Sequence, residues 1–167
     1  FILDSTQGRI EFESLRAFIQ GDPGAVLLVE FFDDDPARID RLAADLEQRE
    51  LGHYVYRAIT AEDQARIWEL RKAALGLTMS QMGDAKSISF VEDTAVAPEH
   101  LHDYIARFQQ ILARHEIPSG FYAHAAVGLL HIRPVVDMKS ANGVEKFSLI
   151  AHEVADLVLE YGGALSG

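Results

Sequence analysis

The chain has 167 residues, of which 49% are hydrophobic and 25% are charged, the composition of an ordinary globular domain or two small ones. Its 26 acidic and 15 basic side chains give a formal net charge of −11, and no cluster of Lys and Arg offers a surface for nucleic acid or anionic lipid. The absence of cysteine excludes disulfides, thiolate metal sites and iron–sulfur clusters within the chain, and a reducing cytoplasm is the expected location. No stretch approaches the ~20 apolar residues of a membrane-spanning helix.

The spacing of apolar residues predicts short strands alternating with helices. Asp35-Pro36 is typical of a helix start, and the stretch from Thr60 to Asp63 matches a capping box. We predict strands at residues 25–32, 53–59 and 86–92 and in the β-rich segment 121–133, and helices at 36–51, 60–75, 98–117 and 144–161. This order suits a two-layer α+β sandwich or a parallel α/β sheet. We favour the α+β class, with a ferredoxin-like sandwich whose sheet is mostly antiparallel and whose helices lie on one face.

Two of the seven histidines are candidate metal ligands. His124 and His131 are spaced symmetrically about Val127-Gly128, so a two-residue turn there would pair them directly across a hairpin. The Cβ atoms of such a pair lie about 4.5–5.5 Å apart, and two imidazoles at that distance can converge on one metal ion. The alternative is that they fill polar positions of an ordinary hairpin. A metal site would also need a carboxylate ligand.

Three cations are candidates for binding an anionic substrate. Arg71 lies late on a mostly apolar predicted helix and could direct its guanidinium at a carboxylate, although it could equally be a helix-surface cation paired with an acidic neighbour. Lys86 opens a predicted strand, and Arg133 would share a strand face with His131. The neighbouring acids Glu92-Asp93 are predicted to point to opposite faces of a strand, which argues against a catalytic dyad.

Four linked motifs resemble one protein family. They are Trp68-Glu-Leu-Arg71-Lys72, then Phe90-Val-Glu-Asp-Thr-Ala-Val-Ala-Pro98, then His124-x6-His131-Ile-Arg-Pro134, then Gly162-Gly-Ala-Leu-Ser-Gly167. In this order, over about residues 25–167, they are similar to the C-terminal, substrate-side domain of FAD-linked oxidases and dehydrogenases of the vanillyl-alcohol-oxidase type. Glycolate oxidase FAD subunits, D-lactate dehydrogenases and D-2-hydroxyglutarate dehydrogenases belong to that group. The histidine motif is more similar to that of long bacterial members, which carry a fused iron–sulfur domain.

The resemblance implies roles for the candidate residues. It implies that His124 and His131 are catalytic residues that hold a divalent metal, commonly zinc, which contacts the hydroxyl and carboxylate of a 2-hydroxy acid. It places Arg71 on the substrate carboxylate and Lys86 at a further substrate contact. Arg133 is a third substrate-binding candidate, although it departs from the residue of better-known members. The implied reaction transfers a hydride from the substrate to FAD.

The resemblance also implies that residues 1–167 are one domain of a longer protein. An FAD-binding domain is expected upstream, and the family motif continues after Gly167 with Glu-His-Gly, whose glutamate would be the third metal ligand. Alone, the chain is expected to be colourless and inactive, and to bind zinc weakly. The resemblance does not determine the electron acceptor, whether the protein forms a homodimer, or whether it associates peripherally with the inner membrane. The rival interpretation is a non-catalytic α+β module for ligand binding or dimerisation.

Overall fold

A computed structural model describes residues 2–79 and 83–166. The chain divides into two compact units, one from Ile2 to Ala74 and the other from Leu75 onward, and each is described by itself. None of the helices in the described residues contains a stretch long and apolar enough to cross a membrane.

The first unit consists of helices joined by extended segments. Its helices are α1 (Ile2–Thr6), α2 (Ile10–Glu13), α3 (Pro36–Gln48) and the greater part of α4 (Ala61–Met79). Both predicted helix starts are confirmed, because the Asp35 carboxylate accepts a hydrogen bond from the Ala37 amide (3.0 Å) and the Thr60 hydroxyl accepts one from the Asp63 amide (3.1 Å). These helices begin where local capping chemistry predicts.

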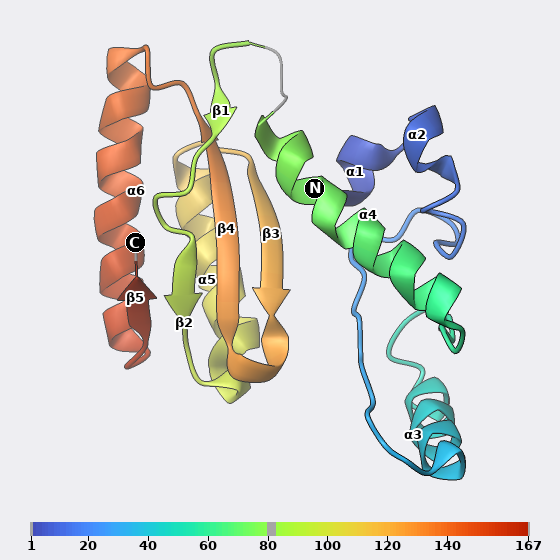
Figure 1. The fold of residues 1–167 in the computed structure, drawn as a ribbon. Helices are drawn as coiled ribbons and strands as arrows, with labels where there is room; N and C mark the ends of the chain where they lie inside the picture. Colours follow the sequence, from blue (N-terminus) through green and yellow to red (C-terminus); the bar gives the residue numbers. More distant parts are fainter. Residues whose placement is uncertain (1, 80–82, 167) are drawn as a thin grey trace. The chain divides into compact units, whose positions relative to one another are not determined.

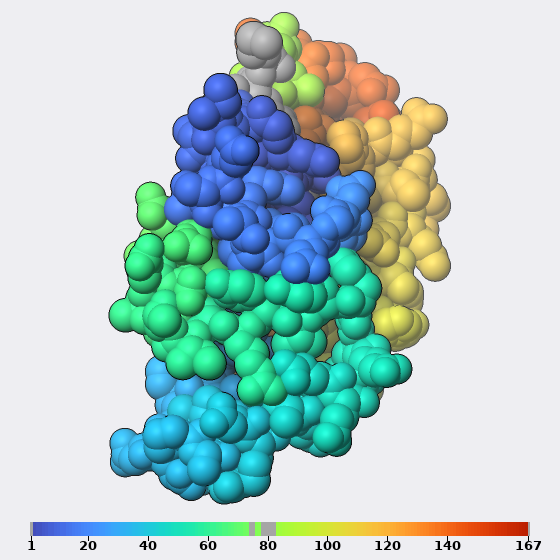
Figure 2. Space-filling model, turned by 90° about the vertical axis from the view of Figure 1, so that its right-hand side faces the viewer, coloured from blue at the N-terminus to red at the C-terminus, as the bar shows by residue number. Residues whose placement is uncertain are grey.

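The predicted strands at residues 25–32 and 53–59 are wrong. Both segments are irregular, and their apolar side chains are largely exposed, with Leu27 at 72% and Phe32 at 87%. Figure 2 shows the surface of the first unit, coloured from blue to green. The residues of this unit that the structure describes form no regular strand. A strand is stabilised by hydrogen bonds and side-chain contacts with a neighbouring strand. A run of apolar residues does not by itself provide that neighbour.

The second unit is an antiparallel sheet with two long helices. Its strands are β1 (Lys86–Ser87), β2 (Asp93–Ala95), β3 (Ser119–His124), β4 (Leu129–Val136) and β5 (Ala164–Ser166). Strand β4 is central, because it pairs with β1 and β2 along one side and with β3 along the other, and β5 pairs with β2 (Figure 1). All these pairs are antiparallel, as predicted for an α+β fold.

The two faces of the sheet differ. Helices α5 (Leu101–Arg114) and α6 (Ala141–Glu160) pack on one face and form the core with alternate residues of β4. On that face Leu130 and Ile132 are fully buried, whereas His131 and Arg133, which alternate with them along the strand, point to the other face and are half-buried. The helices therefore leave the histidine-bearing face of the sheet uncovered within this unit.

The predicted strand at residues 86–92 is interrupted. The pairs Ser87↔Val135 and Asp93↔His131 show that this segment advances six positions while β4 advances only four. The two extra residues make a bulge-like irregularity between β1 and β2, which ends the simple alternation of side chains. Glu92 consequently lies just before β2 rather than inside a continuous strand.

Candidate functional site

The β3–β4 hairpin turns through a longer loop than the two-residue turn that we predicted. A single turn of 3₁₀ helix (Ala125–Val127) and Gly128 connect the strands, so His124 pairs with Leu129 rather than with His131. Gly128 adopts φ +68°, and its carbonyl accepts a hydrogen bond from the Val96 amide (3.1 Å). A Cβ at this position would lie 1.8 Å from the Val96 oxygen, so only glycine fits.

The two histidines nevertheless lie on the same face and close together. The register is displaced by two residues from the predicted one, and such a displacement preserves the face that each side chain occupies. The imidazole centroids of His124 and His131 are 5.3 Å apart, with the ring planes at 83°. Tyr122 pairs directly with His131 in the ladder, and its ring is 5.6 Å from each imidazole. The predicted proximity of the two histidines is confirmed, while direct pairing is wrong.

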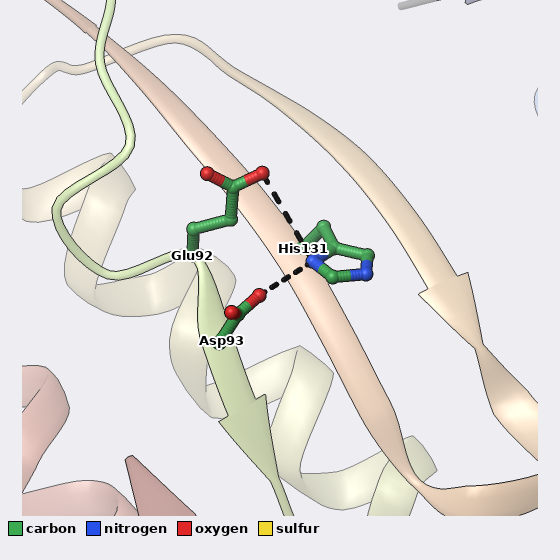
Figure 3. Close-up of side chains that lie close together, drawn as sticks. All are labelled: Glu92, Asp93 and His131. Carbon is green, nitrogen blue, oxygen red and sulfur yellow. Dashed lines mark ion pairs between the residues drawn. The ribbon is translucent and has the colours of Figure 1, made fainter. Parts of the chain in front are cut away.

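Two carboxylates approach His131 from β2 and the residue before it (Figure 3). Asp93 Oδ1 lies 2.7 Å from His131 Nδ1, and Glu92 Oε1 lies 4.0 Å from the same nitrogen. The prediction that these neighbouring acids are kept apart on opposite strand faces is therefore wrong. The irregular backbone between β1 and β2 is the cause, and no signal in the sequence marked it.

Arg133 lies beside the same acids. Its Nη2 and Nε atoms donate hydrogen bonds to Glu92 Oε1 at 2.5 Å and 3.1 Å. Partial burial opposes ionisation of Glu92, but hydrogen bonds from Ser89 and Arg133 and the charge of Arg133 outweigh it, so the pKa of this carboxyl lies below its usual value. Arg133 and His131 share a sheet face, as predicted, and Arg133 balances the charge of Glu92.

The other two predicted substrate contacts belong to other elements of the chain. Lys86 is an exposed residue of β1 and pairs with Val136, at the opposite end of β4 from the hairpin. Arg71 belongs to the first unit, where its guanidinium carbon lies 4.6 Å from the centroid of the Trp68 ring. Their roles in substrate binding stay predictions.

The donor groups fit a divalent metal ion. Imidazole nitrogens and carboxylate oxygens are the ligands that zinc takes in proteins that lack thiolates. Glu92, Asp93 and His131 offer ligand atoms that all lie within 4.8 Å of one another. His131 Nδ1 is buried and lacks a hydrogen bond of normal alignment in the described structure, although Asp93 is at contact distance. His131 Nε2 points away from both carboxylates (Figure 3).

These features describe an α+β domain with a cluster of imidazole and carboxylate groups on the sheet face opposite α5 and α6. The chain belongs to the family of FAD linked oxidases, C-terminal domain, whose family model matches residues 2–167.

Curated relatives cover nearly the whole chain. It is 38% identical, over 99% of its length, to a D-2-hydroxyglutarate dehydrogenase of Pantoea ananatis, and 35% identical over 99% to the Escherichia coli protein of the same name. It is 26% identical over 86% to glycolate oxidase subunit GlcD of Bacillus subtilis, of which it covers 30%. The chain spans 18% of the length of the two D-2-hydroxyglutarate dehydrogenases.

Proposed function

We propose that the chain is the substrate-side domain of a longer FAD-dependent dehydrogenase that oxidises a 2-hydroxy acid of the D-2-hydroxyglutarate, D-lactate or glycolate class. The observation that carries the proposal is the pair of imidazoles, 5.3 Å apart on the sheet face opposite α5 and α6, in a chain of this family. The names of the relatives make D-2-hydroxyglutarate the first substrate to test.

In this proposal His124 and His131 hold a divalent metal, most simply zinc. Catalytic zinc sites normally have three protein ligands, so a third ligand is required. We infer that it is the glutamate of a Glu-His-Gly motif following the chain, as the family resemblance implies. A metal ion bound there would stabilise negative charge on the substrate hydroxyl oxygen.

The cations of the domain would position the substrate. Arg71 would bind the substrate carboxylate through its guanidinium, whose paired N–H groups match a carboxylate. Lys86 and Arg133 are proposed as further anion contacts. Arg133 already donates to Glu92, so its role would be to add positive charge near the site while its own orientation is held.

The redox step needs a hydride acceptor, and FAD supplies that chemistry when bound. We place its binding site on another part of the longer protein, as the family resemblance implies. In the balanced reaction the substrate α-carbon loses a hydride and its hydroxyl loses a proton to a nearby base. The domain's residues would fix which face of the substrate reacts. A fused iron–sulfur domain is a further proposal from the resemblance.

The test is anaerobic reduction of the flavin in the longer protein, followed as loss of its visible absorbance. D-2-hydroxyglutarate, D-lactate and glycolate are mixed separately with the oxidised protein and with its His131→Ala and His100→Ala variants. We expect one of the acids to reduce the flavin, with the rate falling at least roughly 100-fold in His131→Ala and unchanged in His100→Ala. Failure of all three acids to reduce the flavin would contradict the proposal and favour a binding module.

A further inference from the structure

We propose that Asp93 is a positioning residue that keeps a proton on His131 Nδ1 and thereby presents the Nε2 lone pair to a divalent cation. The inference rests on the proposed metal role of His131 and assigns the residue that orients this ligand. In protein metal sites, a ligating imidazole commonly donates its other N–H to a carboxylate, which determines both its tautomer and its ring orientation.

The backbone places Asp93 for this role. Asp93 pairs directly with His131 across β2 and β4, and on its other side it pairs with Ser166 of β5. Adjacent Thr94 is fully buried against the helices. Asp93 is therefore held from both sides, and its Oδ1 lies 2.7 Å from the buried Nδ1. This distance is short enough for a hydrogen bond, although the contact is not aligned as one in this structure.

The charges beside Nδ1 argue against a cation on that side of the ring. Arg133 donates two hydrogen bonds to Glu92, so the second carboxylate beside Nδ1, 4.0 Å from it, is already neutralised by a guanidinium. The 2.7 Å separation of Asp93 Oδ1 from Nδ1 is a hydrogen-bond distance, and it is shorter than the roughly 3.3 Å between two donors of one tetrahedral zinc ion. Glu92, Asp93 and His131 are better explained as an orienting network than as a set of three ligands.

The other side of the ring is left for an ion shared with His124. Two imidazoles that bind one tetrahedral zinc ion have centroids roughly 5 Å apart. The centroids of His124 and His131 are 5.3 Å apart, and Nε2 of His131 points away from the acids (Figure 3). The same imidazole therefore has one nitrogen for Asp93 and one for the metal.

The tautomer can be measured directly by nitrogen-15 NMR of the chain labelled on histidine, at about pH 8.5, where an ordinary imidazole is neutral. We expect His131 to carry its proton on Nδ1 and to have a pyridine-type Nε2. In Asp93→Asn the amide can donate to Nδ1, so the proton should move to Nε2. Glu92→Gln is the matched control, since it removes an equal charge 4.0 Å from Nδ1 and should keep the wild-type tautomer.

A proton on Nε2 in the wild-type chain would overturn the inference, and so would a tautomer that follows Glu92→Gln rather than Asp93→Asn. The wild-type spectrum decides the question even if a variant does not fold.

A zinc titration separates this inference from the proposed function. Asp93→Asn should weaken zinc binding roughly 10- to 100-fold, Asp93→Glu should recover part of the loss, and the exposed Asp156→Asn should change nothing. Full affinity in Asp93→Asn contradicts the role of Asp93. Full affinity in His131→Ala contradicts the metal site itself, whatever the tautomer.

Discussion

Gly128 has a φ of +68° and its Cα lies close against the Val96 carbonyl. This residue determines the shape of the loop that follows His124. We expect Gly128→Ala to lower the free energy of unfolding by roughly 3 kcal/mol, because the new Cβ meets backbone and the conformation disfavours side chains. Gly162→Ala is the matched control, with φ +61° but nothing within 4 Å of its Cβ, and should cost only about 1 kcal/mol. Urea unfolding of the three chains measures both, and equal losses would contradict the steric explanation.

Glu92 should make stability depend on pH. Its folded-state pKa is lowered from the ordinary 4.5, chiefly because hydrogen bonds from Ser89 and Arg133 overcome the effect of partial burial. Such a carboxyl adds stability above its unfolded-state pKa, and the contribution is lost as the pH falls through the folded-state pKa. The difference in unfolding free energy between the wild type and Glu92→Gln should therefore be largest near neutrality and shrink below pH 4.5.

Unfolding curves at a series of pH values from 7 downward give this difference. A constant or growing difference toward acid pH would contradict the assigned ion pair. Arg133→Gln, which removes the other partner, should show the same pH dependence.

Among the elements, helices α5 and α6 are joined at one end by a three-residue cluster. Glu153 of α6 contacts both Arg114 and His115 at the end of α5, with His115 Nε2 2.6 Å from Glu153 Oε1. Despite partial burial, hydrogen bonds from His115 and Arg114 keep the pKa of Glu153 below its usual value. The cluster is partly shielded from solvent, since the His115 side chain is 15% exposed.

We expect Glu153→Gln to lower the free energy of unfolding by about 1 kcal/mol, because two charge-assisted hydrogen bonds are weakened. The comparison is Glu160→Gln, which removes the more exposed pair with Arg107 and should change stability by less than about 0.5 kcal/mol. Thermal or urea unfolding at neutral pH distinguishes them. A larger loss of stability in Glu160→Gln would contradict the expectation that the less exposed ion pair contributes more to the free energy of unfolding.

Local signals made the four long helices predictable, whereas the short helices α1 and α2 were not predicted. Asp35 and Thr60 cap helices at the positions expected, and the apolar spacing predicted a helix over the residues of α5. Helix α6 begins at Ala141, three residues before the predicted start, because Ser140 caps it by accepting a hydrogen bond from the Gly143 amide. Helix geometry is determined by residues three and four apart, which a sequence displays directly.

Strand pairing was less predictable because it depends on distant residues. The sequence placed His124 and His131 on one face but could not determine the register, which Gly128 sets through its contact with Val96. The approach of Glu92 and Asp93 to His131 was missed for the same reason. Their approach follows from the pairing between Ser87 and Asp93, where this segment advances six positions while β4 advances four. That mismatch is visible only once the partner strand is known.

At the scale of the whole molecule, the chain is a family domain that spans 18% of its D-2-hydroxyglutarate dehydrogenase relatives. The first unit exposes apolar residues in the segments 25–32 and 53–59, whereas the second has a well-packed core. The proposed function accordingly belongs to a longer protein, in which this domain supplies the imidazole pair and candidate anion contacts. The isolated chain is predicted to bind no flavin and to show no turnover, which its visible spectrum and an assay with 2-hydroxy acids would check.

The most direct test of the central proposal is the metal content of the longer protein after exhaustive dialysis, measured by elemental analysis together with protein concentration. We predict about one divalent ion per chain, retained in His100→Ala and lost in both His124→Ala and His131→Ala. Flavin content, read from the visible spectrum, serves as the control that each variant is folded. Retention of the full metal content by folded His124→Ala and His131→Ala proteins would contradict the assignment of the imidazole pair as the metal site.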